Sequence, residues 1–338
     1  MAGSQSFFPS FHEAWWLPGG HLQTLGGKYL RPAPRLPLQR ERWETPDQDF
    51  LDLDFGSDPD PGSPMVLILH GLEGFSRRPY VLHAMETLGR WGISAVALNF
   101  RGCSGEPNRL SRMYHSGETL DTAFVLSRLR ERWPDRPLGA LGFSLGGNVL
   151  LKLSGEREDG GTGLLDAAAT ISVPFDLQAG VELLEGTRVG KVYMDYFLKS
   201  LKGKVERKRS LLAPILDLER VMVAETLRAF DDLATAPLHG FKDAREYYAQ
   251  SSSSLFLSGI RTPTLLIHGR NDPFLPESAL PLAVMEDNPA LTPLISAGGG
   301  HVGFVAGALP GRPQFWAEDQ VARFFRRCFE PPADRAGG

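Results

Sequence analysis

The sequence has few cysteines and lacks any long apolar run. Only two of its 338 residues are cysteines, Cys103 and Cys328, and they lie far apart. Two such residues cannot supply a disulfide framework or a multi-cysteine zinc site, so we expect a reducing, cytoplasmic setting. The opening stretch MAGSQSFFPSFHEAWWLPGG has neither a basic start nor an uninterrupted apolar centre. We therefore expect no signal peptide, no spanning helix and no stable membrane insertion.

An excess of basic residues is also missing. The chain has 36 Lys and Arg against 40 Asp and Glu, a net charge of -4, whereas nucleic-acid-binding proteins need clustered basic residues. The one basic cluster, KGKVERKRS at residues 202–210, is short and contains an acid. It favours a solvated helix face over a contact with a partner or a membrane surface. We predict no nucleic-acid partner, and nothing in the sequence implies a metal or an organic cofactor.

Short apolar runs separated by helix-like segments are the main feature of the chain. The runs are MVLILH (65–70), ISAVALNF (93–100), LGALGF (138–143), AAATISV (167–173), TPTLLIHG (262–269) and LTPLISA (291–297). Residues 80–92 and 117–137 have helical apolar spacing, residues 40–56 alternate like an antiparallel hairpin, and residues 315–329 indicate a closing amphipathic helix. This order predicts an α/β fold with a mostly parallel central sheet flanked by helices.

After Pro174 the alternation stops, and residues 175–254 show helical periodicity without a buried strand. We predict a first core part with an N-terminal extension at 1–174, a helical lid at 175–254 and a second core part at 255–338. As a group, the apolar residues of the first lid helices should form a wall of an acyl pocket. They are Leu183, Leu184, Val192, Tyr193, Tyr196, Phe197 and Leu201.

A glycine-flanked serine lies where the strand LGALGF gives way to the helix-like NVLLKL. Residues 142–146 match G-x-S-x-G around Ser144, and another glycine follows. In a nucleophile elbow the serine occupies a strained turn with its hydroxyl exposed, and the glycines avoid collisions with the neighbouring strand and helix. The lysine and spacing of a P-loop and a complete G-x-G-x-x-G are missing. We predict that Ser144 is a nucleophile rather than a structural turn residue.

A serine nucleophile needs a base and an acid that orients the base. Asp272 follows the run TPTLLIHG, and His301 lies in a glycine-rich loop after the next run. Ser, Asp, His is the chain order of α/β-hydrolases. Asp176, after the preceding strand, is a competing acid whose alternative role is a helix N-cap. His70 and His268 end strands, and we expect packed or loop-bonding histidines there.

Two main-chain N–H groups are candidates for an oxyanion hole. One belongs to Leu145, immediately after the serine at the start of a helix, where the helix dipole also favours negative charge. The other belongs to Leu72, in the loop after the first central strand. Glu73 is expected to brace that loop, and Ser104, whose surroundings do not match G-x-S-x-G, to be loop structure.

Several longer motifs resemble the YheT-like esterases of the α/β-hydrolase superfamily. They are AWWLPGGHLQTL (14–25), HGLEG (70–74), NFRGCSGEPNRLSRMYHSGETLD (99–121), GFSLGGN (142–148), FDDLATAPLHGFKDAREYY (230–248), GRNDPF (269–274) and GGGHVGF (298–304). This family is also similar to eukaryotic α/β-hydrolase-domain lipases and to fungal enzymes that make and hydrolyse ethyl esters of medium-chain acids. The resemblance implies an α/β-hydrolase fold, a role in lipid metabolism, and Ser144, Asp272 and His301 as the catalytic set.

These observations predict a serine carboxylesterase that hydrolyses short- to medium-chain acyl esters through an acyl-enzyme. The substrate is then a small-molecule ester, and we expect a monomer or a weak dimer. Transfer of the acyl group to an alcohol, or thioester hydrolysis, uses the same acyl-enzyme. A non-catalytic binding protein on a hydrolase scaffold is the alternative from another class. Dehalogenases and epoxide hydrolases of this fold are disfavoured because they need an aspartate where this chain has Ser144.

Overall fold

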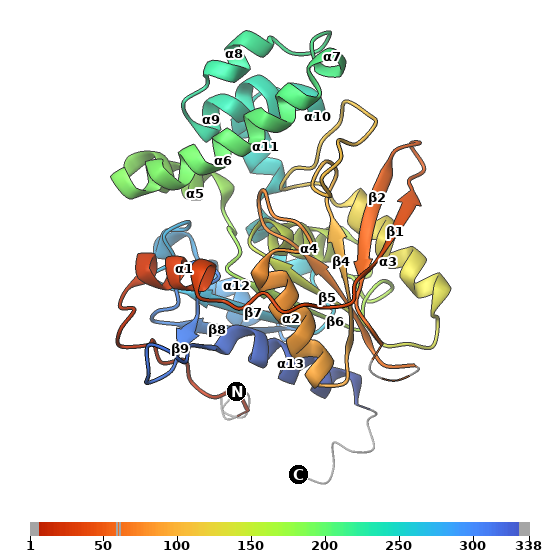
Figure 1. Ribbon diagram of the computed structural model, residues 1–338, viewed down its shortest axis with the longest axis vertical. Coiled ribbons are helices and arrows are strands. Elements are labelled where there is room, and N and C mark those ends of the chain that lie inside the picture. Colours follow the sequence, from red (N-terminus) through yellow and green to blue (C-terminus); the bar gives the residue numbers. More distant parts are fainter. Residues whose placement is uncertain (1–6, 59, 61, 331–338) are drawn as a thin grey trace.

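The apolar runs of the sequence form one eight-stranded sheet with the order β1-β2-β4-β3-β5-β6-β7-β8 (Figure 1). The computed structural model describes residues 7–58, 60 and 62–330, so the outermost residues of the predicted core parts lie outside this description. The central strands are β3 (Met65–Leu69), β4 (Ser94–Asn99), β5 (Leu138–Phe143), β6 (Ala167–Ile171), β7 (Thr264–Gly269) and β8 (Leu291–Ser296). These strands run parallel to one another. Each falls within the run that predicted it.

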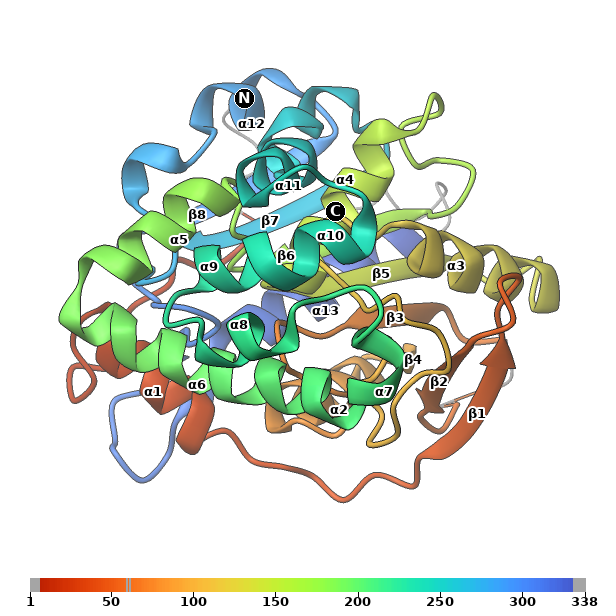
Figure 2. The ribbon, with the colours of Figure 1, turned by 90° about the horizontal axis from the view of Figure 1, so that it is seen from above.

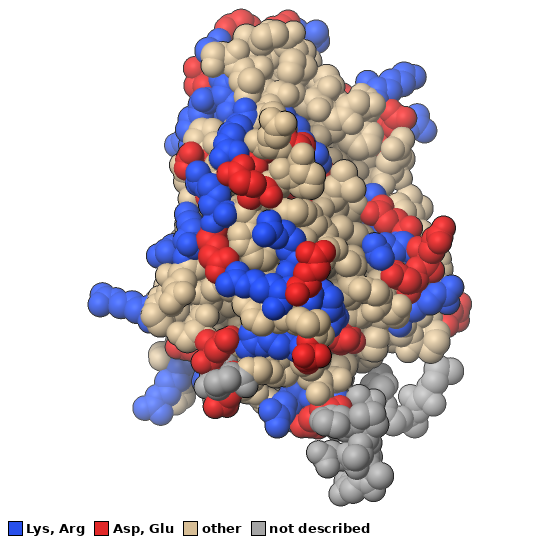
Figure 3. Space-filling model, turned by 90° about the vertical axis from the view of Figure 1, so that its right-hand side faces the viewer, with Lys and Arg blue, Asp and Glu red and all other residues tan. Residues whose placement is uncertain are grey.

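The expected hairpin forms the antiparallel edge of the sheet. Strand β1 (Gln39–Glu44) pairs with β2 (Phe50–Phe55), which in turn pairs antiparallel with β4. Arg40 and Arg42 pair with the buried carboxylates of Asp54 and Asp52, at 2.6 and 2.8 Å. Figure 3 shows basic and acidic side chains interspersed on this side of the molecule. Both arginines of β1 are therefore paired with carboxylates of the neighbouring strand.

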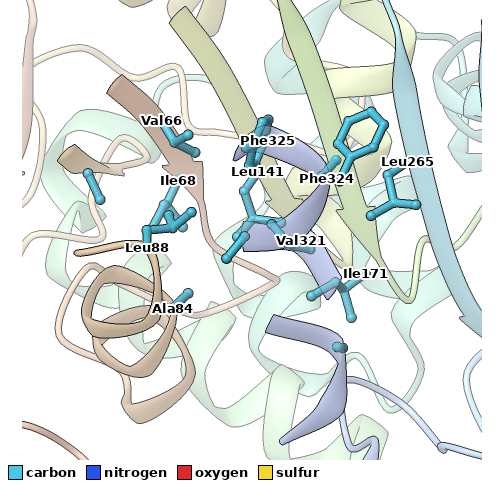
Figure 4. Close-up of a cluster of buried hydrophobic side chains, with 14 of the residues drawn as sticks. Val66, Ile68, Ala84, Leu88, Leu141, Ile171, Leu265, Val321, Phe324 and Phe325 are labelled. Carbon is cyan, nitrogen blue, oxygen red and sulfur yellow. The ribbon is translucent and has the colours of Figure 1, made fainter. Parts of the chain in front are cut away.

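Helices α2 (Pro79–Arg90) and α13 (Trp316–Phe329) cover one face of the sheet. Pro79 stands in the first turn of α2, where a missing N–H costs no hydrogen bond. Figure 4 shows the buried cluster between these helices and the sheet. It includes Val66, Ile68, Leu88, Leu141, Ile171, Leu265, Val321 and Phe325. Burial of one such side chain contributes about 1.5–3 kcal/mol, so this layer fixes both helices on the sheet.

The opposite face is covered by α3 (Leu120–Arg132), α4 (Leu145–Glu156) and α12 (Leu282–Asp287). Helix α4 begins directly at the end of the buried strand β5 and packs on it through Val149, Leu150 and Leu153. The remaining core elements are α1 (Gly20–Tyr29), the 3₁₀ turn η4 (Glu277–Ala279) and the short antiparallel pair β9 (Val305–Ala306) and β10 (Gln314–Phe315). This arrangement places the β5–α4 corner at the carboxyl end of the sheet.

Between β6 and β7 the chain forms a helical layer, which we call the cap (residues 177–251). Its elements are α5 (Leu177–Gly186), α6 (Arg188–Arg207), α7 (Arg209–Leu212), α8 (Leu218–Val223), α9 (Leu227–Phe230), the π-helical turn η1 (Asp231–Thr235), α10 (Ala236–His239) and α11 (Ala244–Ser251). The 3₁₀ turns η2 (Ser253–Leu255) and η3 (Leu257–Gly259) lead back to β7. Figure 2 shows α9 and α10 above the central strands. The cap has its own apolar core, which includes Leu198, Val205 and Val221.

The basic cluster at residues 202–210 is only partly the solvated helix face that the sequence indicated. Two of its lysines, Lys204 and Lys208, are buried. Lys204 binds Glu73, and Lys208 donates to the Asn108 side chain at 2.9 Å. These two lysines therefore join the end of α6 to core loops, whereas Glu206, Arg207 and Arg209 are exposed and form the expected solvated face. In the part of the chain that the structure describes, none of the helices has both the length and the apolar character needed to cross a membrane.

Candidate active site

Ser144 occupies a sharp turn between β5 and α4. Its backbone has φ 51° and ψ -118°, a conformation that residues with a Cβ rarely adopt and that costs on the order of 1–3 kcal/mol. The turn is held because the Ser144 N–H donates to the carbonyl of Ile171 on the neighbouring strand, at 2.9 Å. Helix packing after the turn and strand pairing before it keep the strained residue in place.

The flanking glycines leave no room for side chains. A Cβ on Gly146 would lie 2.5 Å from the carbonyl oxygen of Leu69. A Cβ on Gly142 would lie 2.5 Å from the Cα of Gly147. Because real Cβ atoms do not approach backbone so closely, the G-x-S-x-G spacing is a steric requirement of this corner. This is the collision that the sequence pattern indicated.

Three side chains from three strand ends meet beside this turn. His301 Nε2 lies 2.9 Å from Ser144 Oγ. On the other side of the ring, His301 Nδ1 lies 2.9 and 3.1 Å from the two carboxylate oxygens of Asp272. The carboxyl ends of β5, β7 and β8 share one edge of the parallel sheet, so the loops after these strands converge. The structure thus brings together the serine, acid and histidine predicted from the sequence.

Electrostatics fix the orientation of the histidine. Burial would raise the pKa of Asp272, but the interaction and hydrogen bonds with His301 hold that pKa below its ordinary value. The ionised carboxylate accepts a hydrogen bond from Nδ1–H, and Nε2 is left to accept one from the Ser144 hydroxyl. The ring of Phe274 stacks on His301 with centroids 4.2 Å apart. The main-chain N–H of Phe274 also donates to Asp272, at 2.8 Å.

The competing acid, Asp176, has a different role in the structure. It is the N-cap of α5, and its side chain accepts from the Ala179 N–H at 3.0 Å. The two strand-end histidines are packed, as expected. Burial lowers the pKa of His70 to about 3 and that of His268 to about 4, so both rings are neutral near neutral pH. Ser104 lies in a loop, where its carbonyl accepts from Arg40.

A cavity of about 130 Å³ opens beside Ser144 and His301, between the sheet and the cap. Leu72 and Leu145, whose N–H groups are the predicted oxyanion donors, also line it. Leu145 is the first residue of α4, so its N–H has no carbonyl partner within the helix. The cap supplies apolar walls, namely Leu177, Val181, Leu184, Phe197, Leu201 and Leu227.

The predicted wall of apolar lid residues is only partly correct. Leu184, Phe197 and Leu201 line the cavity. Val192 and Tyr196 face outward instead, with 66% and 44% of their surface exposed. Tyr193, another aromatic residue of α6 in that set, stacks on His21 and makes a tilted ring contact with Phe274, with centroids 4.9 Å apart. The apolar residues of α6 do have helical spacing, but this 20-residue helix turns only one stripe of side chains toward the cavity.

The N-terminal segment supports the histidine loop, a role that sequence reasoning missed. Thr24 Oγ1 accepts from the His301 N–H at 2.9 Å. Asn271 Oδ1 accepts from the Gly300 N–H at 2.9 Å, and the Asn271 amide donates to Glu13 at 3.0 Å. The motif at residues 14–25 was the available signal, but hydrogen bonds over such sequence separations cannot be derived from spacing.

Glu73 braces the loop of Leu72 more extensively than expected. It accepts from Tyr114 Oη at 2.6 Å, from Lys204 Nζ at 2.7 Å and from Ser200 Oγ. The lysine and serine belong to α6 of the cap. The loop that carries a predicted oxyanion donor is therefore tied to the cap by a buried ion pair.

Known proteins resemble this chain in sequence and in fold. A family model described as alpha/beta hydrolase fold matches residues 64–308. The protein named esterase YheT of Escherichia coli (strain K12) is 37% identical over 305 residues, covering 89% of this chain and 88% of the relative. The monoacylglycerol lipase of Saccharomyces cerevisiae is 32% identical over 276 residues, or 79% of this chain and 60% of the lipase. A solved Pyrococcus furiosus esterase shares the fold, with a TM-score of 0.57 at 16% identity, over 87% of this chain and 94% of that one.

Proposed function

This chain belongs to the α/β-hydrolase family, and on that basis we propose that it is a serine carboxylesterase acting on short- to medium-chain acyl esters through an acyl-enzyme. Its similarity to proteins named esterase and lipase supports an ester hydrolase. The observation that carries the mechanism is the 2.9 Å contact between Ser144 Oγ and His301 Nε2 at the wall of a cavity. A hydroxyl becomes a useful nucleophile when such a base accepts its proton.

In the proposed reaction, Ser144 Oγ attacks the ester carbonyl carbon while His301 Nε2 takes the hydroxyl proton. The tetrahedral intermediate then expels the alcohol, which receives that proton from His301. Water then attacks the acyl carbon while His301 takes a proton from it. Collapse of the second tetrahedral intermediate breaks the bond between the acyl carbon and Ser144 Oγ, His301 returns the proton to Oγ, and the acid leaves. Asp272 keeps Nδ1–H pointed away from the serine and stabilises the imidazolium at both stages.

The negative charge of the intermediate falls on the former carbonyl oxygen. We assign its stabilisation to the N–H groups of Leu145, the first residue of α4, and of Leu72, in the loop after β3. The amino-terminal end of α4 adds a favourable dipole for an anion. Loss of one such donor typically costs about 10²–10³ in kcat, so the loop of Leu72 must be held firmly.

The proposed acyl site is the apolar part of the cavity below the cap. Walls of leucine, valine and phenylalanine side chains favour hydrocarbon, at about 0.8 kcal/mol per buried CH₂. A lipase name among the relatives agrees with a lipid-derived ester, and so with a role in lipid metabolism. The cap also excludes water from the site, which strengthens the electrostatic interactions within it.

A chain-length series of p-nitrophenyl esters tests this function. From acetate upward, each added methylene should raise kcat/KM by up to about fourfold until the cavity is full. Ser144→Ala should abolish the hydrolysis of every ester without changing the fold. If kcat/KM falls steadily from acetate to longer esters, the proposed acyl site is wrong. If Ser144→Ala keeps full activity, the proposed mechanism is wrong. Product analysis with added ethanol separates hydrolysis from acyl transfer.

We also propose a cytoplasmic location and a monomeric or weakly dimeric state. The low cysteine content supports the first. Cell fractionation tests the location, and light scattering over a range of protein concentrations tests the state of association.

A further inference from the structure

One wall of the cavity is polar, in contrast to the apolar walls around it. Asp231, Thr235 and Tyr248 line the same cavity as Ser144. Thr235 Oγ1 donates to Asp231 Oδ1 at 2.6 Å, and Tyr248 Oη donates to Asp231 Oδ2 at 2.7 Å. The carboxylate is thus held in one orientation by two hydroxyls. An aspartate fixed in this way inside a mostly apolar cavity needs an explanation.

The backbone that presents Asp231 is also unusual. Residues Asp231–Thr235 form the π-helical turn η1, between α9 and α10 of the cap. Single π-helical turns within α-helices are rare and occur frequently at functional sites. Figure 2 shows the flanking helices α9 and α10 above the central strands. Asp231 therefore lies on the cap side of the cavity, whereas Ser144 lies on the sheet side.

The charge of Asp231 is poorly compensated. Its two hydrogen-bond donors are neutral hydroxyls, and a carboxylate has about four acceptor sites. Burial, together with the nearby Asp232 and Glu185, raises the pKa of Asp231 to about 6 although the two hydroxyls act to lower it. Near neutral pH the group is still mostly ionised. Asp231 is half-buried and lines the cavity, so the acceptor sites that the two hydroxyls leave open are available to a ligand's hydrogen-bond donor.

Resting on the proposed function, we propose that Asp231 is a specificity residue that binds a hydrogen-bond donor, a hydroxyl or an ammonium group, on an otherwise apolar ester substrate. The donor group occupies the polar wall of Asp231, Thr235 and Tyr248. The hydrocarbon part lies along the apolar walls, and the ester reaches Ser144. The site then selects polar-substituted esters, such as hydroxylated or amino-substituted acyl esters or glycerol esters, over plain alkyl esters.

Matched esters test this inference. The acyl-side series is p-nitrophenyl octanoate, 8-hydroxyoctanoate and 8-aminooctanoate, and the alcohol-side pair is ethyl octanoate and 1-octanoylglycerol. For each pair, kcat/KM for the ester that carries the hydroxyl or ammonium group is divided by kcat/KM for the ester that lacks it. This ratio is measured in the wild type, Asp231→Leu and Asp231→Asn. Asp195→Leu, at an exposed acid of α6, is the matched control.

For at least one pair, the ratio should be about tenfold or more higher in the wild type than in Asp231→Leu, as expected for a hydrogen bond to a charged group. Asp195→Leu should keep the wild-type ratio. In Asp231→Asn, a preference for the ammonium ester should fall, whereas a preference for a hydroxyl ester should persist in part because the amide oxygen still accepts. Ratios that are equal in the wild type and in Asp231→Leu for every pair would overturn the inference.

Two measurements keep this test independent of the proposed function. Labelling with a fluorophosphonate reports whether each variant retains an intact site, and Asp231→Asn decides the question if Asp231→Leu does not fold. If no ester is hydrolysed, the proposed function fails and calorimetry replaces kinetics. Calorimetry then measures how much more tightly 1,8-octanediol, or 8-amino-1-octanol, binds than 1-octanol. This preference should be about tenfold smaller in Asp231→Leu than in the wild type, and an unchanged preference would refute the site.

Discussion

Thr24 accepts a hydrogen bond from the main-chain N–H of His301, which follows it by 277 residues in the sequence. The contact joins α1 to the loop that presents the imidazole to Ser144. The two segments approach closely elsewhere too, since a Cβ on Gly300 would lie 2.3 Å from the Gly20 carbonyl oxygen. The N-terminal extension is thus part of the support of the candidate active site and not an appendage.

Replacement of Thr24 should therefore impair turnover. Thr24→Val keeps the shape of the side chain but leaves the His301 N–H without its acceptor, so the loop can shift. We expect kcat to fall about tenfold or more, because misplacement of a reacting group by about 1 Å can cost 10²-fold. KM should change little. Thr24→Ser, which keeps the hydroxyl, should retain most activity, and equal kcat in the valine and serine variants would refute this role.

Substitution of the two candidate acids, Asp272 and Asp176, should have clearly different effects on kcat. Asp272→Asn leaves His301 in the wrong tautomer, so kcat should fall by about 10⁴. Asp176→Asn should change kcat only modestly, because asparagine is as good an N-cap for α5 as aspartate. Steady-state kinetics on one ester suffice, with circular dichroism to confirm folding. A large loss in the Asp176 variant alone would move the acid to the end of β6.

The buried pair of Glu73 and Lys204 should matter for both stability and turnover. Lys204→Met leaves Glu73 uncompensated, and breaking a buried pair in this way typically costs about 3–5 kcal/mol. Because Glu73 adjoins Leu72, kcat should fall as well. Urea denaturation and ester kinetics measure the two effects, and Lys199→Met on the exposed side of α6 is the control.

The double variant Glu73→Gln/Lys204→Met removes both charges. It should recover part of the stability lost in Lys204→Met, since no unpaired charge then remains. If the single and double variants are equally destabilised, the lost packing of the lysine stem explains the effect and the ion pair does not.

Stability should also depend on pH through Asp231. An unfolded aspartate titrates near 3.9, whereas burial raises the pKa of Asp231 to about 6 in the folded chain. Between these values the folded state keeps a proton that the unfolded state releases, so stability falls as the pH rises through this window. Relative to Asp231→Asn, the wild type should lose about 2–3 kcal/mol between pH 4 and 7. Urea denaturation across that range measures it, and a constant difference would contradict the titration.

Much of the fold follows from local sequence pattern. Parallel strands are buried on both faces, so they occur as continuous apolar runs such as residues 65–70 and 138–143, which are easily recognised. The convergence of Ser144, Asp272 and His301 follows from the same pattern, because loops after parallel strands meet at one edge of the sheet. Their catalytic roles stay predictions for the experiments above.

Features that depend on contacts across the chain were not predictable. Lys204 lies in α6 and Lys208 caps its C-terminal end, and their burial depends on acceptors such as Glu73 and Asn108 in core loops. Helical periodicity likewise could not tell that Val192 faces outward, since α6 packs on both the cap and the core. The π-helical turn at Asp231 has no comparable signal in the spacing of residues.

The most direct test of the central claim, that Ser144 is the nucleophile, is the location of the covalent adduct. The wild-type protein is treated with a fluorophosphonate, digested and analysed by tandem mass spectrometry. We predict a single modification on Ser144, no adduct at that position in Ser144→Ala, and much slower labelling in His301→Ala. Adduct formation on a different serine, or continued ester hydrolysis by wild-type protein that does not label at all, would contradict the account.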